Sequence, residues 1–225
     1  MLLGASNCKK LGVFDDNIIN VINVSISGST LDNIDDIVSK AKSIVLKSNK
    51  CIDNIVVCLG TKDVTRNHTD RDEVNINVTN AINCVKLAFP DVKKNGICSI
   101  LPRKGKGQNI TRLNETTKIV NSFILKICKK DPVISLFDIH STFCNQEGNA
   151  NRSLFDNNEP SGVHINNEGV NKLIEQLYLY MSSVEQVDVN CRMLSMRKRN
   201  LSSTTPQSSE KLGKLHKSGT PSGVV

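Results

Sequence analysis

The 225-residue chain contains no tryptophan, and aromatic residues make up only 4% of it. Because 38% of the residues are hydrophobic, the core has to be built mainly from Ile, Val and Leu, which suits the buried strands of a parallel sheet. The length allows one α/β domain with a full core and leaves too few residues for a second comparable one. We therefore expect a single folded domain.

Apolar segments long enough to cross a bilayer, which takes about 20 residues, are also missing from the sequence. The start, MLLGAS, is a very short apolar run that meets Lys9 and Lys10 and lacks the architecture of a secretory signal peptide. We therefore expect no membrane span and a cytoplasmic or nuclear location. The brevity of this first run leaves room for residues upstream of Met1.

The eight cysteines include no pair with CxxC spacing, so the sequence indicates neither a zinc site nor a thioredoxin-type motif. Most of them lie in apolar runs such as IVVCLG and GICSIL, which favours reduced core thiols over disulfides. The phosphate-loop pattern G-x-x-x-x-G-K-[ST] is absent as well. The glycine- and lysine-rich PRKGKGQN is therefore not a nucleotide-binding loop of that kind.

The formal net charge of +7 lies mostly near the end of the chain. Residues 186–225 hold seven Lys and Arg against Asp188 and Glu210, whereas residues 1–185 hold 22 basic and 20 acidic residues. The end of the chain is also rich in Ser, Thr, Gly and Pro, a composition typical of disorder. We predict a basic, disordered tail over residues 183–225, which could contact RNA or an acidic partner through sequence-independent charge attraction.

Before that tail, residues 1–182 alternate short apolar runs with amphipathic stretches, the pattern of repeated strand and helix units around a parallel sheet. The five predicted strands are Met1–Gly4, Val21–Ser25, Ile55–Leu59, Ile97–Leu101 and Val133–Phe137. Between and after them, apolar residues recur at helical spacing, in stripes that include Val38, Ala81, Ile124 and Leu177. We predict a three-layer α/β/α sandwich with a central parallel sheet of about five strands.

In a sheet of parallel strands, loops and helix N-termini converge at the carboxyl ends of the strands, and ligands bind there. Small, polar and glycine residues follow almost every predicted strand. GASN, SGST, GTKD and PRKGKGQN come after the first four strands, and PSGVH precedes the last helix. We therefore expect the functional residues in these five segments.

These segments, in this order, resemble the motif blocks of the SGNH (GDSL-type) hydrolase family over roughly residues 1–182. In that family a serine follows the first strand in a Gly-Asp-Ser turn, a glycine follows the second strand, Gly-x-Asn-Asp follows the third, and Asp-x-x-His precedes the last helix. The resemblance implies a flavodoxin-like sandwich of the SGNH-hydrolase type. LLGASN puts Ser6 at the nucleophile position, VSISGST puts Gly28 at the second block, VVCLGTKD supplies Gly60 and Asp63, and SGVHINNEG puts His164 at the base position.

The resemblance implies hydrolysis of a small acyl ester with no metal or organic cofactor. A serine hydroxyl is a poor nucleophile until an imidazole within hydrogen-bond reach takes its proton, so we expect Nε2 of His164 near the hydroxyl of Ser6 and a carboxylate near Nδ1. The oxyanion donors would be the backbone N–H groups of Ser6 and Gly28, with Lys62 at the position where the family has an asparagine amide.

The chain departs from the family pattern at three supporting positions. Ala5 replaces the aspartate beside the serine, Lys62 replaces the asparagine, and Ser161 replaces the acid of Asp-x-x-His. The flexible stem of a lysine makes it a poorly preorganised donor, and its charge disfavours a protonated histidine nearby. Asp156 and Glu159 lie on the same loop, and either could orient the histidine instead. Because losing a triad acid costs on the order of 10⁴ in turnover in serine proteases, we expect a slow enzyme.

Further candidates flank these positions. Arg103 and Lys104 follow the fourth strand and could attract an anionic substrate, although a loop of glycines and lysines is more often a solvated connection. His140 follows the fifth strand without belonging to a motif, and Cys8 lies beside Ser6 as a rival nucleophile.

Two interpretations therefore stay open. In the first, the chain is a serine ester hydrolase in which Ser6 and His164 form the working pair. In the second, it is a catalytically inactive domain of the same fold that binds RNA or a protein partner, since relatives that resemble this family include an RNA-binding germ-plasm protein domain without the triad. The intact pair favours the first interpretation, whereas Lys62 and Ser161 favour the second.

Overall fold

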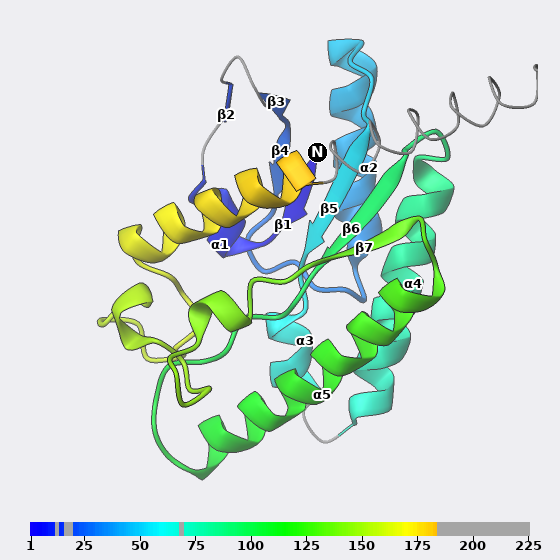
Figure 1. Ribbon diagram of the computed structural model, residues 1–225. Helices are drawn as coiled ribbons and strands as arrows, with labels where there is room; N and C mark the ends of the chain where they lie inside the picture. Colours follow the sequence, from blue (N-terminus) through cyan, green and yellow to red (C-terminus); the bar gives the residue numbers. More distant parts are fainter. Residues whose placement is uncertain (12–13, 16–19, 68–69, 184–225) are drawn as a thin grey trace, which may run out of the picture. The chain divides into compact units, whose positions relative to one another are not determined.

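A parallel sheet of five strands forms the centre of the fold (Figure 1). The structure, a computed structural model, describes residues 1–11, 14–15, 20–67 and 70–183. The five strands lie in the order β4-β1-β5-β6-β7, and all four neighbouring pairs are parallel, which confirms the predicted sheet. They are β1 (Leu2–Gly4), β4 (Asn23–Ser25), β5 (Asn54–Cys58), β6 (Lys94–Cys98) and β7 (Ile134–Phe137).

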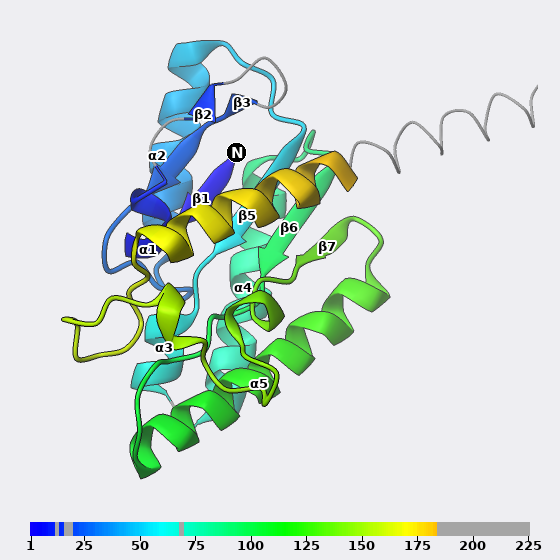
Figure 2. The same cartoon turned by 60° about the vertical axis from the view of Figure 1, so that its left-hand side comes forward.

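Helices cover both faces of this sheet, as Figures 1 and 2 show from two directions. One face packs against α2 (Ile34–Ser48), α4 (Arg71–Ala88) and α5 (Gln108–Lys130), and the other against α1 (Ser6–Lys9) and a helix over residues 167–183. Successive side chains of a strand point to opposite faces, so Ile55 and Val57 of β5 join the first core and Val56 joins the second. The predicted three-layer α/β/α sandwich is confirmed.

The apolar stripes of the sequence form the buried faces of these helices. Val38 of α2, Ala81 of α4, Ile124 of α5 and Leu177 of the last helix are all at most 5% exposed. The third stripe ends where the sequence predicts, because α5 stops at Lys130 and Pro132 cannot continue a helical hydrogen-bond ladder.

Local boundaries differ from the prediction in two strands. The predicted strand Ile97–Leu101 lies earlier, as β6, because the side-chain amide of Asn121 bonds to the backbone N–H and C=O of Ile100, at 2.7 and 3.0 Å. Those contacts replace a neighbouring strand. The predicted strand Val21–Ser25 divides into β4 and the short β3 (Asn20–Val21), which pairs antiparallel with β2 (Phe14–Asp15). The six-residue helix α3 (Thr61–Arg66) carries no apolar stripe long enough to predict it.

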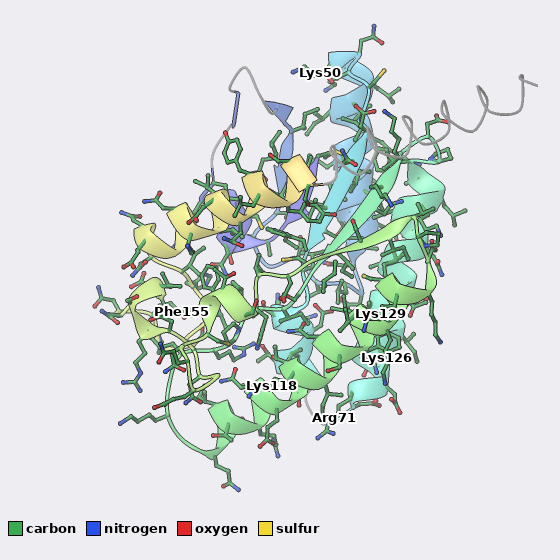
Figure 3. All side chains as sticks on the ribbon, viewed as in Figure 1. Lys50, Arg71, Lys118, Lys126, Lys129 and Phe155 are labelled. Carbon is green, nitrogen blue, oxygen red and sulfur yellow. The ribbon has the colours of Figure 1, made fainter. Side chains whose placement is uncertain are left out.

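The loops that follow β7 have a small aromatic core of their own. Phe143 and Phe155, the latter labelled in Figure 3, are fully buried, and their rings meet edge to face with centroids 5.8 Å apart. Phe155 also forms an isolated antiparallel bridge with Ile165. This packing fixes the segment just before the last helix against the rest of the fold.

Residue contacts group Met1–Ser183 into one unit. The predicted basic tail begins at Ser183, which still belongs to the last helix, and the rest of that prediction lies outside the described residues. Within the described part of the chain, no helix combines the length and apolar character that crossing a bilayer requires.

We predict that Leu177→Ala lowers the free energy of unfolding by about 2–5 kcal/mol, the usual loss when a buried leucine leaves a cavity. Leu177 is 5% exposed, whereas Leu179 on the same helix is 58% exposed. Leu179→Ala is therefore the matched control, with an expected change within about 0.5 kcal/mol. Urea unfolding followed by circular dichroism measures both variants. Equal losses would contradict the packing of this helix on the sheet.

Candidate active site

A cavity of about 420 Å³ lies at the carboxyl ends of the strands. Its wall comes from the loops after β1, β4, β5 and β6 and from the segment before the last helix, as expected for a parallel sheet. Ser161, at the position where the family has an acid, lines this cavity. So do six of the candidate residues: Ser6, Cys8, Gly28, Lys62, Arg103 and His164.

Ser6 is the first residue of α1, two positions after the end of β1. Ala5 occupies the N-cap, so Ser6 does not cap the helix, and its hydroxyl has one hydrogen-bond partner among the described residues, His164. Gly4 permits this tight turn, because a Cβ there would lie 2.5 Å from the Cβ of Cys8. The Ser6 hydroxyl is therefore free to face the cavity.

The imidazole of His164 lies opposite this hydroxyl, with Nδ1 3.5 Å from Ser6 Oγ. This distance is at the long end of a hydrogen bond, and catalytic hydrogen bonds are often long before substrate binds. The expectation that Nε2 faces the serine is not met. Nδ1 is the ring nitrogen nearer to the main chain, and the main chain around His164 is held close to α1.

Asn7 holds that main chain in place. Its side-chain amide donates to the carbonyl oxygen of Val163 at 3.0 Å, and its Oδ1 accepts the backbone N–H of Ile165 at 3.2 Å, so the two bonds bracket His164. The ammonium of Lys10 adds a bond of 2.6 Å to the carbonyl oxygen of Ile165. One turn of helix thus carries the hydroxyl and also positions the imidazole.

Gly28 lies in a tight turn after β4, in which the N–H of Ser29 bonds to the carbonyl oxygen of Ile26 at 3.3 Å. Its φ of +84° is a conformation that glycine adopts without strain. The ammonium of Lys62 donates to the Gly28 carbonyl oxygen at 3.0 Å. Within the described residues, the backbone N–H groups of Ser6 and Gly28 have no acceptor, which leaves both available to an oxyanion.

Of the two candidate acids, Glu159 is the one beside His164. Its carboxylate accepts the backbone N–H of Ser161 at 3.0 Å and the Ser161 hydroxyl at 2.7 Å, and it lies near the backbone N–H and the imidazole of His164. Burial opposes the charge, but these bonds and the nearby imidazole hold the pKa of Glu159 below its ordinary value. Asp156 instead accepts the N–H of Asn158 at 2.9 Å within its own turn. Among the described residues, no carboxylate bonds to the imidazole ring itself.

Arg103 lies in the wall of the cavity and not in a solvated loop, since its side chain is buried and the residue is 5% exposed. Its Nη2 donates to the carbonyl oxygen of Thr61 at 2.6 Å and to the hydroxyl of Thr65. Burial lowers the pKa of Arg103 to about 10, with the charge of Glu159 acting in the opposite direction. The guanidinium therefore stays charged at neutral pH.

Lys104 lies outside the cavity and ties two loops together. Its ammonium donates to the carbonyl oxygen of Asp156, and its backbone N–H donates to the carbonyl oxygen of Gly162 at 2.9 Å. Gly162 has φ +68°, and a Cβ there would lie 1.9 Å from the carbonyl oxygen of Lys104. The loop of Arg103 and the loop of His164 thus touch backbone to backbone, which requires glycine at this position.

The other nucleophile candidate, Cys8, lines the same cavity without being activated, and the other base candidate, His140, lies outside that cavity. A hydrogen bond with Cys58, together with burial, raises the pKa of Cys8 well above its ordinary value, so Cys8 is a neutral thiol and a poor rival to Ser6. His140 lines a second cavity of about 690 Å³, with Nδ1 2.8 Å from the carbonyl oxygen of Ile100. Within the described residues, no cluster of three His, Cys, Asp or Glu side chains could hold a metal ion.

Two positioning residues were not assigned a role from the sequence. Asn7 directly follows Ser6, but polar residues after a strand carry no periodic signal that predicts their partners. Asp63 belongs to the third motif block, and its buried carboxylate accepts the N–H of Leu31 at 2.9 and 3.1 Å. Asp63 thereby joins the loops that carry Gly28 and Lys62.

The sequence matches the model of the GDSL-like lipase/acylhydrolase family over residues 9–172. The matched range includes Gly28, Lys62 and His164 and begins just after the segment that carries Ser6. No curated protein matches the chain.

Solved structures share the fold. A GDSL-like lipase from Bacteroides thetaiotaomicron has a TM-score of 0.58 at 15% identity, over 81% of this chain and 87% of that chain. The OSK domain of Drosophila Oskar has a TM-score of 0.57 at 16% identity, over 78% and 85%. A carbohydrate esterase of family 3 from Talaromyces cellulolyticus has a TM-score of 0.55 at 19% identity, over 82% and 96%. At these identities the likeness establishes the fold alone.

We predict that Asn7→Ala loosens the segment around His164, because it removes both hydrogen bonds that bracket the residue. The expected loss of unfolding free energy is about 1–3 kcal/mol, and the amide hydrogen of Ile165 should exchange faster. Asn7→Asp keeps the Oδ1 acceptor, so this amide should stay better protected. Hydrogen exchange measured by NMR or mass spectrometry gives the comparison, and unchanged exchange in Asn7→Ala would contradict the bracketing role.

Proposed function

The chain belongs to the GDSL-like lipase/acylhydrolase family, and from that premise we propose that it is a serine ester hydrolase in which Ser6 is the nucleophile and His164 the base. The observation that carries this proposal is the distance of 3.5 Å between Ser6 Oγ and His164 Nδ1 inside one cavity. A hydroxyl and an imidazole that face each other across 158 positions of sequence are the minimum that acyl transfer to serine requires.

The reaction begins when Ser6 Oγ attacks the carbonyl carbon of the ester and its proton passes to Nδ1 of His164, whose other hydrogen stays on Nε2. The oxyanion of the tetrahedral intermediate accepts the N–H groups of Ser6 and Gly28. The bond to the alcohol oxygen then breaks, and the alcohol takes the proton from the imidazole while the acyl group stays on Ser6. Water, deprotonated by the same imidazole, releases the acid and restores the hydroxyl.

Glu159 supplies the negative charge that, in the family, comes from the acid in contact with the histidine ring. It does so without a bond to the ring, through its position beside the backbone N–H of His164. A carboxylate at this position stabilises the imidazolium that forms when Ser6 is deprotonated, but less than a direct ring contact would. Lys62, whose ammonium lies on the Gly28 carbonyl oxygen, acts against the imidazolium charge. Slow turnover follows from this balance.

A second candidate function is the inactive domain that binds RNA or a protein partner. Two observations favour it. The ammonium of Lys62 donates to a backbone carbonyl oxygen, and among the described residues no carboxylate bonds to the ring of His164. The basic residues 186–225 would add phosphate contacts. Reaction of Ser6 with an active-site probe separates the two functions.

We predict that a fluorophosphonate probe labels Ser6 by displacement of fluoride, and that the chain hydrolyses short-chain 4-nitrophenyl esters. Ser6→Ala should lose the labelling and most of the hydrolysis, because no other activated nucleophile lines the described cavity, and only the residual rate that binding and the oxyanion donors supply should remain. Ser43→Ala, on the exposed side of α2, is the matched control and should keep both. Absence of labelling in the folded full-length chain would contradict the hydrolase and favour the partner-binding function.

We predict that Glu159→Gln lowers kcat/KM about tenfold to hundredfold at neutral pH, less than the loss of a ring-bonded triad acid. Asp156→Asn, the matched control, should change it by less than about threefold, because that carboxylate serves its own turn. Since the pKa of Glu159 is lowered, its effect is present above the ordinary glutamate value and is lost as pH falls through the lowered one. The ratio of wild type to Glu159→Gln should therefore shrink only in acid. Equal effects of the two variants would remove Glu159 from the mechanism.

A further inference from the structure

Arg103 is a buried cation that forms no ion pair with a carboxylate of the described residues. It is 5% exposed, it forms none of the salt bridges of the described residues, and both of its side-chain hydrogen bonds come from Nη2. Nε and Nη1 therefore donate to no protein atom in the described part of the chain. Neither nitrogen is among the buried polar atoms without a partner in the described residues, so both reach accessible space. A mostly buried cation with open donors suits the binding of a negatively charged group.

The bonds of Arg103 also indicate which cavity its guanidinium faces, since the residue borders both. Thr61 and Thr65, the partners of Nη2, line the cavity of Ser6 and do not line the larger one. Asn114 lines the larger cavity and bonds to the backbone of Arg103, at 2.8 and 3.0 Å. The guanidinium therefore belongs to the cavity of about 420 Å³ and the main chain to the other.

The wall of this cavity carries cations and no carboxylate. Lys62 and Arg103 are its charged residues, and none of its lining residues is Asp or Glu. The carboxylate whose charge acts on Arg103 is that of Glu159, which already accepts two hydrogen bonds from Ser161 and lies near His164. Much of the remaining wall is apolar, with Leu59, Ile100, Leu101, Ile139 and Val163 among its residues. Such a cavity suits a ligand that has an apolar body and one anionic end.

We propose that the substrate is an ester that also carries an anionic oxygen group, a carboxylate in the simplest case, and that Arg103 binds this group while Ser6 attacks the ester carbonyl. The proposal rests on the hydrolase function and names its substrate class. A guanidinium donates in one plane to carboxylate or phosphate oxygens, and such charge-assisted bonds are about twice as strong as neutral ones. Arg103 is therefore a specificity-determining residue, distinct from the groups that break the ester bond.

The test compares esters that differ only in the charge of one end. Mono-4-nitrophenyl adipate is paired with its methyl ester, which places the anion on the acyl side, and 3-acetoxybenzoate is paired with methyl 3-acetoxybenzoate, which places it on the alcohol side. We expect the wild type to prefer the anionic member of at least one pair by about 10- to 100-fold in kcat/KM. Arg103→Gln should remove that preference, whereas Arg103→Lys should keep part of it.

Lys104→Gln is the matched control, because its ammonium bonds outside the cavity and its loss should leave the ratio of the two esters unchanged. A wild type that hydrolyses the neutral member of both pairs as fast as the anionic one overturns the proposal without any variant. If no ester is hydrolysed, the hydrolase function fails and adipate binding decides the inference. Calorimetric titration of the Ser6→Ala chain with adipate should then show binding that Arg103→Gln removes, and absence of such binding overturns it.

Discussion

Two hydrogen bonds made by one side-chain amide place the main chain of His164 opposite Ser6. Asn7 follows Ser6 in the first turn of α1, and its side chain bonds to the main chain on both sides of His164. Asn7, together with the bond from Lys10 to Ile165, therefore links the segment of the hydroxyl to the segment of the imidazole, although the two groups are 158 positions apart in the chain. The second core, which packs α1, Phe155, Ile165 and the last helix on the sheet, keeps both ends of that path in place. Without the bonds of Asn7, the packing of the second core would have to hold Ser6 and His164 near each other.

Charge is distributed around the pair in a way that differs from a complete triad. Two cations, Lys62 and Arg103, line the cavity. The carboxylate of Glu159 is not part of its lining and lies near the backbone N–H of His164. This positive wall attracts an anionic ligand. The proposed hydrolysis and the proposed preference for an anionic substrate thus rest on the same arrangement of charges.

The layered fold follows closely from the sequence, because the apolar runs and stripes that predict it are local patterns repeated along the chain. The gathering of Ser6, Gly28, Lys62 and His164 follows from topology, since the carboxyl ends of parallel strands meet at one edge. The exact strand ends, the burial of single side chains and the position of the acid depend on contacts between residues far apart in the chain, and no local sequence pattern predicts them. Asn121 ends β6 early by occupying the backbone of Ile100. The sequence around Arg103 is rich in glycine and lysine and suggests a solvated loop, whereas contacts with α3 and with Asn114 of α5 hold Arg103 against the fold. Which of Asp156 and Glu159 lies near His164 likewise depends on their turns: the carboxylate of Asp156 bonds to Asn158, and that of Glu159 bonds to Ser161.

The backbone contact between Gly162 and Lys104 makes the loop of the cation and the loop of the imidazole one mechanical unit. Free-energy coupling between two sites is reciprocal. A displacement of the loop that carries Arg103 therefore acts on the loop that carries His164, and the reverse holds as well. The positions of the guanidinium and the imidazole are in this sense set together.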